Sequence, residues 1–324
     1  MRLTARLTIL IAVAAVIAGG TVAWVSTSHS SAVAFQHVDD RHTAVHTHAS
    51  PTPTASPSPV YTIQVTGAPK GVAAKGAVIA DASTGQVLWS RDLETERPMA
   101  SITKVMTALL VLQSGDLNRV LTVPNGVLNY VWKYDGDSAG FKPGEKLTEY
   151  DLLEALLVTS AADAAYTFAT DLGPGLTAWV AKMNAEASAL GMAHTHFTSP
   201  DGLPYPTETS TYSTPADLLV LGLAAMKYPV LRSIVNQRSY RLPAGPGHPQ
   251  FWWDNTDELL GSYAGAIGIK TGFTDDAGHC LLFAAVRNGR ELMGVVLGSP
   301  ENGAGAGAQA AAKILNWGFA LKTT

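Results

Sequence analysis

Cysteine is almost absent from this 324-residue chain, which contains only Cys280. A single cysteine excludes a disulfide within the chain and a zinc or iron–sulfur site built from several cysteines. Charged residues are also sparse, at 15%, and the 22 lysines and arginines against 26 acidic residues give a net charge of −4. Because nucleic-acid binding depends on clustered Lys and Arg, and the sequence has no such cluster, we predict no nucleic-acid partner.

The longest uncharged apolar run is at the N-terminus, at residues 7–25, directly after Arg2 and Arg6. At about 1.5 Å of rise per residue, a helix of this length can cross a bilayer. An Ala-x-Ala site at Ala32–Ala34 would also permit cleavage before Phe35. Residues 1–34 are therefore a signal peptide or an N-terminal membrane anchor, and either predicts that the rest of the chain lies outside the cytoplasm.

A polar segment follows at residues 35–60, rich in His, Ser, Thr and Pro. Such a segment buries too little apolar surface to offset the entropy lost on ordering, so we predict a disordered linker. Five of the nine histidines precede residue 61, but a solvated linker is a better interpretation than a metal-binding tract, and we predict no metal site. Residues 61–324 are then a single domain, and the chain's 47% of hydrophobic residues are enough for a core.

Apolar runs separated by turn residues predict strands at both ends of this domain. Residues 76–92 contain two short runs around Ser83-Thr84-Gly85, and residues 264–272 form another. Asn288-Gly289 favours a type I′ turn, so the flanking runs 280–287 and 290–298 should pair as a hairpin.

Helical spacing of apolar residues lies between the strand groups and after them. It predicts helices at 102–109, 152–157, 176–190, 215–227 and 308–320. The expected fold class is α+β: a five-stranded antiparallel sheet flanked by helices, with an inserted helical region.

Two motifs fail on their context. Gly136–Gly140 fits the G-x-S-x-G elbow of serine hydrolases, but that elbow needs a preceding strand and a following helix, and Pro143 disfavours the helix. We interpret it as a polar surface loop. Gly303–Ala308 resembles a dinucleotide-binding turn, but the chain ends before the expected acidic ribose ligand. No cofactor is expected.

Ser101 and Lys104 form a more promising pair at the start of the helix predicted at 102–109. Residues three apart share a helix face, so the hydroxyl and the amine can meet. A serine needs an adjacent base to become a nucleophile, and lysine is a base only when burial or a second cation lowers its pKa. Lys270-Thr271-Gly272 follows an apolar strand pattern, and Ser160 ends a predicted helix.

These three elements, in this order, resemble the penicillin-binding protein and serine β-lactamase superfamily. Longer segments such as PASITKVMTALLVL and IGIKTGFTDDAGHCLLFAAVRNGRELMGVVLG are similar to low-molecular-weight D-alanyl-D-alanine carboxypeptidases. The resemblance covers roughly residues 70–320 and implies a β-lactamase/transpeptidase-like fold, with 61–324 as the D,D-peptidase catalytic domain. It implies that the substrates are peptidoglycan stem peptides and that β-lactams are covalent inhibitors.

The resemblance also implies a role for each motif residue. Ser101 is the nucleophile, Lys104 its base and Ser160 a proton relay to the leaving amine. Lys270 and Thr271, with Gly272 leaving room beside the strand, bind the terminal carboxylate. The backbone N–H groups of Ser101 and Phe273 form the oxyanion hole.

Two positions depart from the family pattern. The middle motif is usually Ser-x-Asn, whose amide contacts substrate and holds the lysine, but Ala162 stands at its third position; restoring the amide with Ala162→Asn should then raise activity. No basic residue occurs at 302–306, where the family often has an arginine. Two alternatives therefore stay open: a D,D-endopeptidase or transpeptidase using the same site, and a weakened penicillin- or muropeptide-binding protein. A β-lactamase is disfavoured, since no suitably spaced Glu-bearing loop is evident.

Overall fold

The computed structural model describes residues 67–300 and 305–322. The predicted leader at 1–34 and linker at 35–60 lie outside these residues. Within the described ranges no single helix is both long and apolar enough to cross a membrane; Pro215–Ala225 and Pro229–Val235 reach that length only together, and they bend by 111° at their junction.

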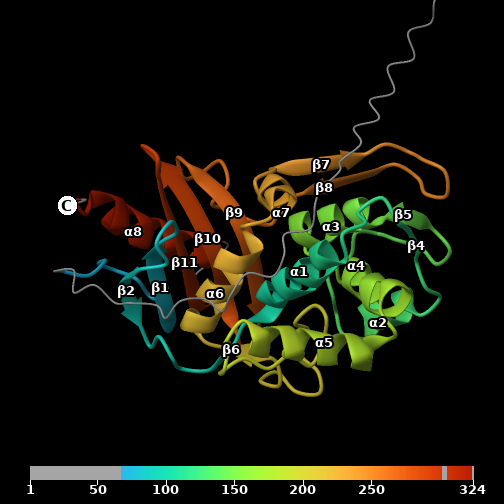
Figure 1. Cartoon of the computed structure of the whole chain (residues 1–324), viewed down its shortest axis with the longest axis horizontal. Helices are drawn as coiled ribbons and strands as arrows, with labels where there is room; N and C mark the ends of the chain where they lie inside the picture. Colours follow the sequence, from blue (N-terminus) through green and yellow to red (C-terminus); the bar gives the residue numbers. More distant parts are fainter. Residues whose placement is uncertain (1–66, 301–304, 323–324) are drawn as a thin grey trace, which may run out of the picture. The chain divides into compact units, whose positions relative to one another are not determined.

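A five-stranded antiparallel sheet with the order β2-β1-β11-β10-β9 organises the domain (Figure 1). Its strands are β1 (Gly76–Asp81), β2 (Val87–Arg91), β9 (Ala266–Thr274), β10 (Gly278–Arg287) and β11 (Arg290–Ser299). The predicted fold class and all five predicted strands are confirmed. Asn288 and Gly289 both have positive φ, at 51° and 77°, as a type I′ turn requires, and β10 pairs with β11 through Arg287 and Arg290.

Alternate residues of the central strands pack into two different cores, one on each face of the sheet. Ala77 and Ile79 of β1 face α8 (Ala306–Ala320), where Ile314 and Leu315 are fully buried. Val78 and Ala80 belong to the larger core on the opposite face. This period of two is the expected result when both faces of a strand are covered.

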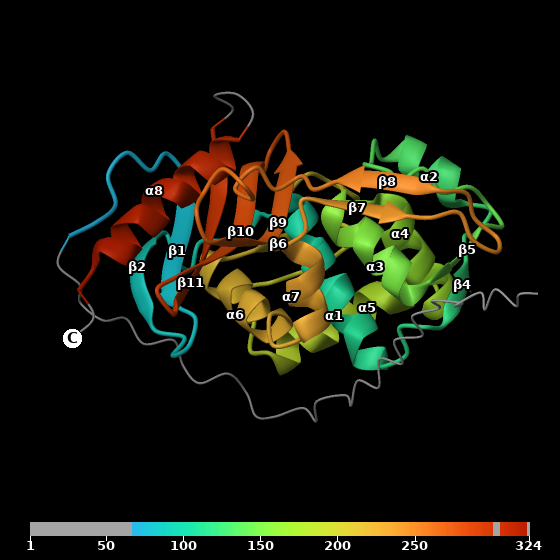
Figure 2. The same cartoon turned by 90° about the horizontal axis from the view of Figure 1, so that it is seen from above.

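The larger core is formed with helices on the other side of the sheet (Figure 2). It contains α1 (Lys104–Ser114), which follows the short 3-10 helix η1 (Ala100–Thr103), α3 (Glu149–Val158) and α6 (Pro215–Ala225). The helical region inserted between β2 and β9 also includes α2 (Val127–Lys133), α4 (Ala162–Thr167), the π-helical η2 (Phe168–Leu172), α5 (Leu176–Ala189) and α7 (Pro229–Val235).

Three two-stranded ribbons complete the domain: β3 (Arg97–Pro98) with β6 (Tyr212–Ser213), β4 (Val120–Thr122) with β5 (Lys146–Thr148), and β7 (Ser239–Leu242) with β8 (Phe251–Asp254). The site depends on one consequence of this topology. Strand β9 is an edge of the sheet, and its open side packs against η1.

Candidate active site

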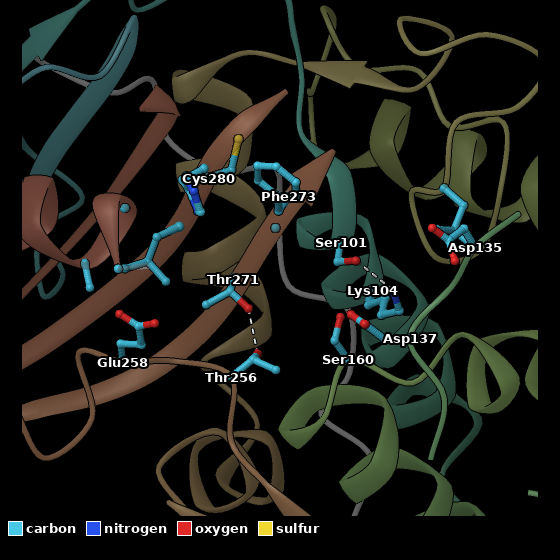
Figure 3. A pocket seen from close by; sticks show the side chains of 17 residues that line it. Ser101, Lys104, Asp135, Asp137, Ser160, Thr256, Glu258, Thr271, Phe273 and Cys280 are labelled. Atoms are coloured by element: carbon cyan, nitrogen blue, oxygen red, sulfur yellow. Dashed lines mark hydrogen bonds between the residues drawn. The ribbon is translucent and has the colours of Figure 1, made fainter. Parts of the chain in front are cut away.

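A cavity of about 420 Å³ lies between β9 and the inserted helical region (Figure 3). Six of the predicted site residues line it: Ser101, Lys104, Ser160, Thr271, Gly272 and Phe273. Residues that are more than 150 positions apart in sequence, such as Ser101 and Thr271, therefore share one cavity.

The amine of Lys104 lies beside the hydroxyl of Ser101, with 2.8 Å between Nζ and Oγ. Ser101 is in η1 and Lys104 begins α1, so the predicted sharing of one helix face is confirmed. Nζ also donates to the backbone carbonyl of Asp201 at 3.1 Å. Lys104 is only 1% exposed, and this burial lowers its pKa, against the opposing carboxylates of Asp201, Asp137 and Asp163.

A second lysine is buried nearby. Lys270 on β9 is 1% exposed, and its Nζ donates to the carbonyl and hydroxyl oxygens of Thr271, at 3.2 and 3.4 Å. Burial, followed by the charge of Lys104, lowers the pKa of Lys270 to about 7. Lys270 is not among the residues that line the cavity, but its amine contacts Thr271, which does.

Ser160 connects the end of α3 to the start of α4. It is 3% exposed and has φ of +65°, a left-handed conformation that costs a non-glycine residue about 1–3 kcal/mol. Figure 3 shows its hydroxyl directed to the same point as Ser101 and Lys104. Ser160 thus lines the same cavity as Ser101 and Lys104.

Gly272 permits the close approach of β9 to η1. A Cβ added here would lie 2.7 Å from the carbonyl oxygen of Met99 and 3.1 Å from the backbone nitrogen of Ser101. No side chain fits without moving that backbone, so glycine is what brings the edge strand alongside the nucleophile.

Comparisons with known proteins identify the family. The family model of D-alanyl-D-alanine carboxypeptidases matches residues 63–301. The chain belongs to the D-alanyl-D-alanine carboxypeptidase family. A carboxypeptidase of this name from Streptomyces sp. strain K15 is 37% identical over 262 residues, covering 77% of this chain and 88% of that protein. Another, from Mycobacterium tuberculosis, is 41% identical over 245 residues, covering 75% and 81%.

Two further relatives of the present chain are named for other activities. A D-alanyl-D-alanine endopeptidase from Pseudomonas aeruginosa is 34% identical, covering 70% of this chain and 71% of that protein. The crystal structure of the Streptomyces K15 DD-transpeptidase superposes with a TM-score of 0.73 at 36% identity, covering 78% of this chain and all of that one. The fold is therefore that of a D,D-peptidase.

The two departures from the family pattern have different structural outcomes. Ala162 begins α4, is fully buried and does not line the cavity. The loop at 135–140 packs against it, since its backbone nitrogen donates to the carbonyl oxygen of Asp137 at 2.8 Å. The stretch without an arginine lies largely outside the described residues, because only Gly305 and Ala306 of 302–306 are described.

Sequence reasoning missed several polar residues of the cavity. Thr256 lines the cavity, and its hydroxyl oxygen lies 2.6 Å from that of Thr271. Asp137, in the segment interpreted as a polar surface loop, and Glu258 also line it. No local pattern marks these residues, because the cavity brings together segments that are distant in sequence.

Proposed function

We propose that this protein is a serine-type D,D-carboxypeptidase that removes the terminal D-alanine of peptidoglycan stem peptides through an acyl-enzyme on Ser101. The observation that carries the proposal is the 2.8 Å contact between Ser101 Oγ and the buried amine of Lys104 in a chain of this family. β-Lactams, which also present a carbonyl carbon and a carboxylate, acylate the same hydroxyl.

Acylation begins when Oγ of Ser101 attacks the carbonyl carbon between the two D-alanines and its proton passes to Lys104. Lys104 accepts that proton only as a neutral amine, and its burial favours the neutral form. Ser160 then relays the proton to the nitrogen of the leaving D-alanine as the C–N bond breaks. Water releases the acyl group in the second half of the reaction.

The carbonyl oxygen of the attacked peptide bond gains negative charge during the reaction and needs hydrogen-bond donors. The backbone N–H groups of Ser101 and Phe273 supply them in this proposal, and the contact of Gly272 with η1 supports it, since it brings the two backbones together. Loss of one oxyanion donor generally lowers the rate about 10²–10³-fold.

The terminal carboxylate is recognised by side chains of β9 and of the segment that precedes it. Thr271 and Thr256 line the cavity with hydroxyl groups, and Lys270, whose amine contacts Thr271, contributes a positive charge. A charge-assisted hydrogen bond of this kind is worth about 1.5–3 kcal/mol.

A second function uses the same acyl-enzyme with a different acceptor or a different peptide donor. The same acyl-enzyme could pass to an amine of another stem peptide, or form on a cross-linked peptide, giving transpeptidase or endopeptidase activity. The names of the Streptomyces K15 structure and the Pseudomonas relative favour keeping this candidate.

We place the enzyme outside the cytoplasm, held at the membrane by residues 7–25 if these are not cleaved. The apolar run after Arg2 and Arg6 supports this location, as does a substrate that lies in the cell wall.

The test is release of D-alanine from a peptide ending in D-Ala-D-Ala by the full-length chain. Ser101→Ala serves as the matched variant. We expect release that depends on Ser101, with the shortened monomeric peptide as the other product; a dimer of stem peptides formed alongside the released D-alanine would instead favour the transpeptidase. No turnover of either kind would contradict both.

A further inference from the structure

Asp137 has a carboxylate at the cavity, and none of the catalytic roles proposed above involves it. It lies in the loop between α2 and β5, and its backbone carbonyl holds Ala162 by the 2.8 Å hydrogen bond from the Ala162 nitrogen. Its side chain lines the cavity and in Figure 3 points toward Lys104 and Ser160. The residue is thus fixed to position 162 by its backbone and faces the reacting groups with its carboxylate.

The loop occupies the space that a longer residue 162 would need. A Cβ added to Gly136 would lie 2.9 Å from the Cβ of Ala162 and 2.9 Å from Cδ1 of Leu203. Glycine at 136 and alanine at 162 therefore fit together, and the polar group that reaches the cavity here comes from Asp137.

The other carboxylates that act on the two lysines each accept at least one hydrogen bond, although Oδ2 of Asp257 is buried without a partner among the described residues. Asp163 accepts from Ser138 and several loop amides, Asp201 accepts from the Tyr130 hydroxyl and the Leu203 amide, and Asp257 accepts from the Leu259 amide. Within the described residues, no hydrogen bond is made by the Asp137 carboxylate. It is therefore available to a lysine, a bridging water or a substrate amide.

The charges around the lysines come from several elements. Asp163 starts α4, Asp201 follows α5, and Asp257 precedes β9, where burial raises its pKa to about 6. The carboxylates of Asp201, Asp137 and Asp163 raise the pKa of Lys104, and those of Asp137 and Asp257 raise that of Lys270. Four more titratable residues line the cavity: Asp135, Glu258, His279 and Cys280. Asp137 alone of these carboxylates acts on both lysines.

We propose that Asp137 is a positioning residue for Lys104 and Lys270. Its carboxylate, held by the loop that packs on Ala162, favours the charged form of both amines. The inference rests on the function proposed above. In the open cavity Asp137 is exposed and its charge is screened by water; a bound stem peptide excludes that water and strengthens the field at both amines. The charge of Asp137 therefore helps to set the pH range in which Lys104 is neutral while Lys270 stays charged.

Asp137→Asn tests this directly, through the pH profile of D-alanine release by the full-length chain. Removing the carboxylate favours the neutral amine at both lysines, so the acid limb, set by Lys104, and the alkaline limb, set by Lys270, both move to lower pH. The ratio of variant to wild-type rate should rise below the wild-type optimum and fall above it. The displacement should be larger for kcat than for kcat/KM, and should shrink as salt is added.

Asp135→Asn is the matched control, because it makes the same change two residues away, in a carboxylate that lines the cavity but is not among the charges acting on either lysine. Its limbs should stay at the wild-type pH, and so should those of Asp137→Glu, which keeps the charge. Wild-type limbs in Asp137→Asn, or equal displacement in Asp135→Asn, would overturn the inference. Failure of the proposed function is recognised separately, as absence of D-alanine release by the wild-type chain.

Discussion

The hydroxyl oxygens of Thr256 and Thr271 lie 2.6 Å apart across the cavity wall. One belongs to the segment before β9 and the other to β9 itself. One of these hydroxyls donates to the other, and a carboxylate bound in the cavity can accept from both. Thr256 is therefore expected to contact the substrate.

Thr256→Val removes this hydroxyl with little change in volume. We predict that KM for a D-Ala-D-Ala peptide rises and that kcat/KM falls roughly tenfold to a hundredfold, because a hydrogen bond to a charged group is worth about 1.5–3 kcal/mol. Steady-state kinetics with Thr122→Val, on exposed β4, as control would show this; an unchanged KM would remove Thr256 from substrate binding.

Gly272→Ala should separate activity from folding. The new Cβ would be 2.7 Å from the Met99 carbonyl oxygen, so β9 and η1 must move apart near Ser101. We expect acylation by benzylpenicillin to slow about 10²-fold or more, comparable to the loss of an oxyanion donor, while the circular dichroism spectrum stays that of a folded protein.

Gly307→Ala is the control for that variant. Gly307 lines the same cavity, but its added Cβ would meet its nearest neighbour at an ordinary 3.5 Å. Acylation should remain near the wild-type rate, and helix α8 should gain about 0.5–1 kcal/mol. Equal slowing in both variants would contradict the account of Gly272.

The alkaline limb of activity should report Lys270. Because its pKa is lowered to about 7, kcat/KM for a D-Ala-D-Ala peptide should fall as pH rises above about 7, when Lys270 loses the charge that attracts the carboxylate. A bound carboxylate stabilises that charge, so the limb for kcat lies at higher pH. Lys270→Arg keeps its charge throughout and should lose this limb; an unchanged limb would assign it to another group.

Ala162→Asn tests whether residue 162 is limited by close packing or whether the asparagine of the family pattern would improve activity. The sequence alone suggested that this change would raise activity, but Ala162 is fully buried under the loop at 135–140. We now expect a loss of about 1–3 kcal/mol of stability from overpacking and no gain in D-alanine release. Thermal unfolding of this variant beside Ala181→Asn, on the exposed side of α5, separates packing from helix propensity; unchanged stability with higher release would restore the original expectation.

The sheet was predictable because its signals are local. Asn288-Gly289 fixes a hairpin by its own backbone preference, and apolar runs mark β9, β10 and β11. Helix α2 and the β7–β8 ribbon were missed. Val127–Lys133 is short and rich in aromatic and β-branched residues, which have modest helix propensity, and the strands of the ribbon are four residues each, with a Pro- and Gly-containing connection between them.

The nucleophile and its base were predictable for a similar reason. Ser101 and Lys104 are three residues apart, so their contact follows from helix geometry. Thr256 and Asp137 could not be found that way, because each reaches the cavity through tertiary packing. Lys270 was assigned to the right strand, but its complete burial depends on neighbours that no local pattern reveals.

Intact-mass spectrometry of the full-length chain with benzylpenicillin tests the central claim most directly, with Ser101→Ala measured alongside. We predict that the wild-type mass increases by one benzylpenicilloyl group, because the 2.8 Å Lys104–Ser101 contact makes Ser101 a nucleophile, and that the variant mass does not change. An adduct that persists in Ser101→Ala, or no adduct at any time while the drug remains intact, would contradict the account.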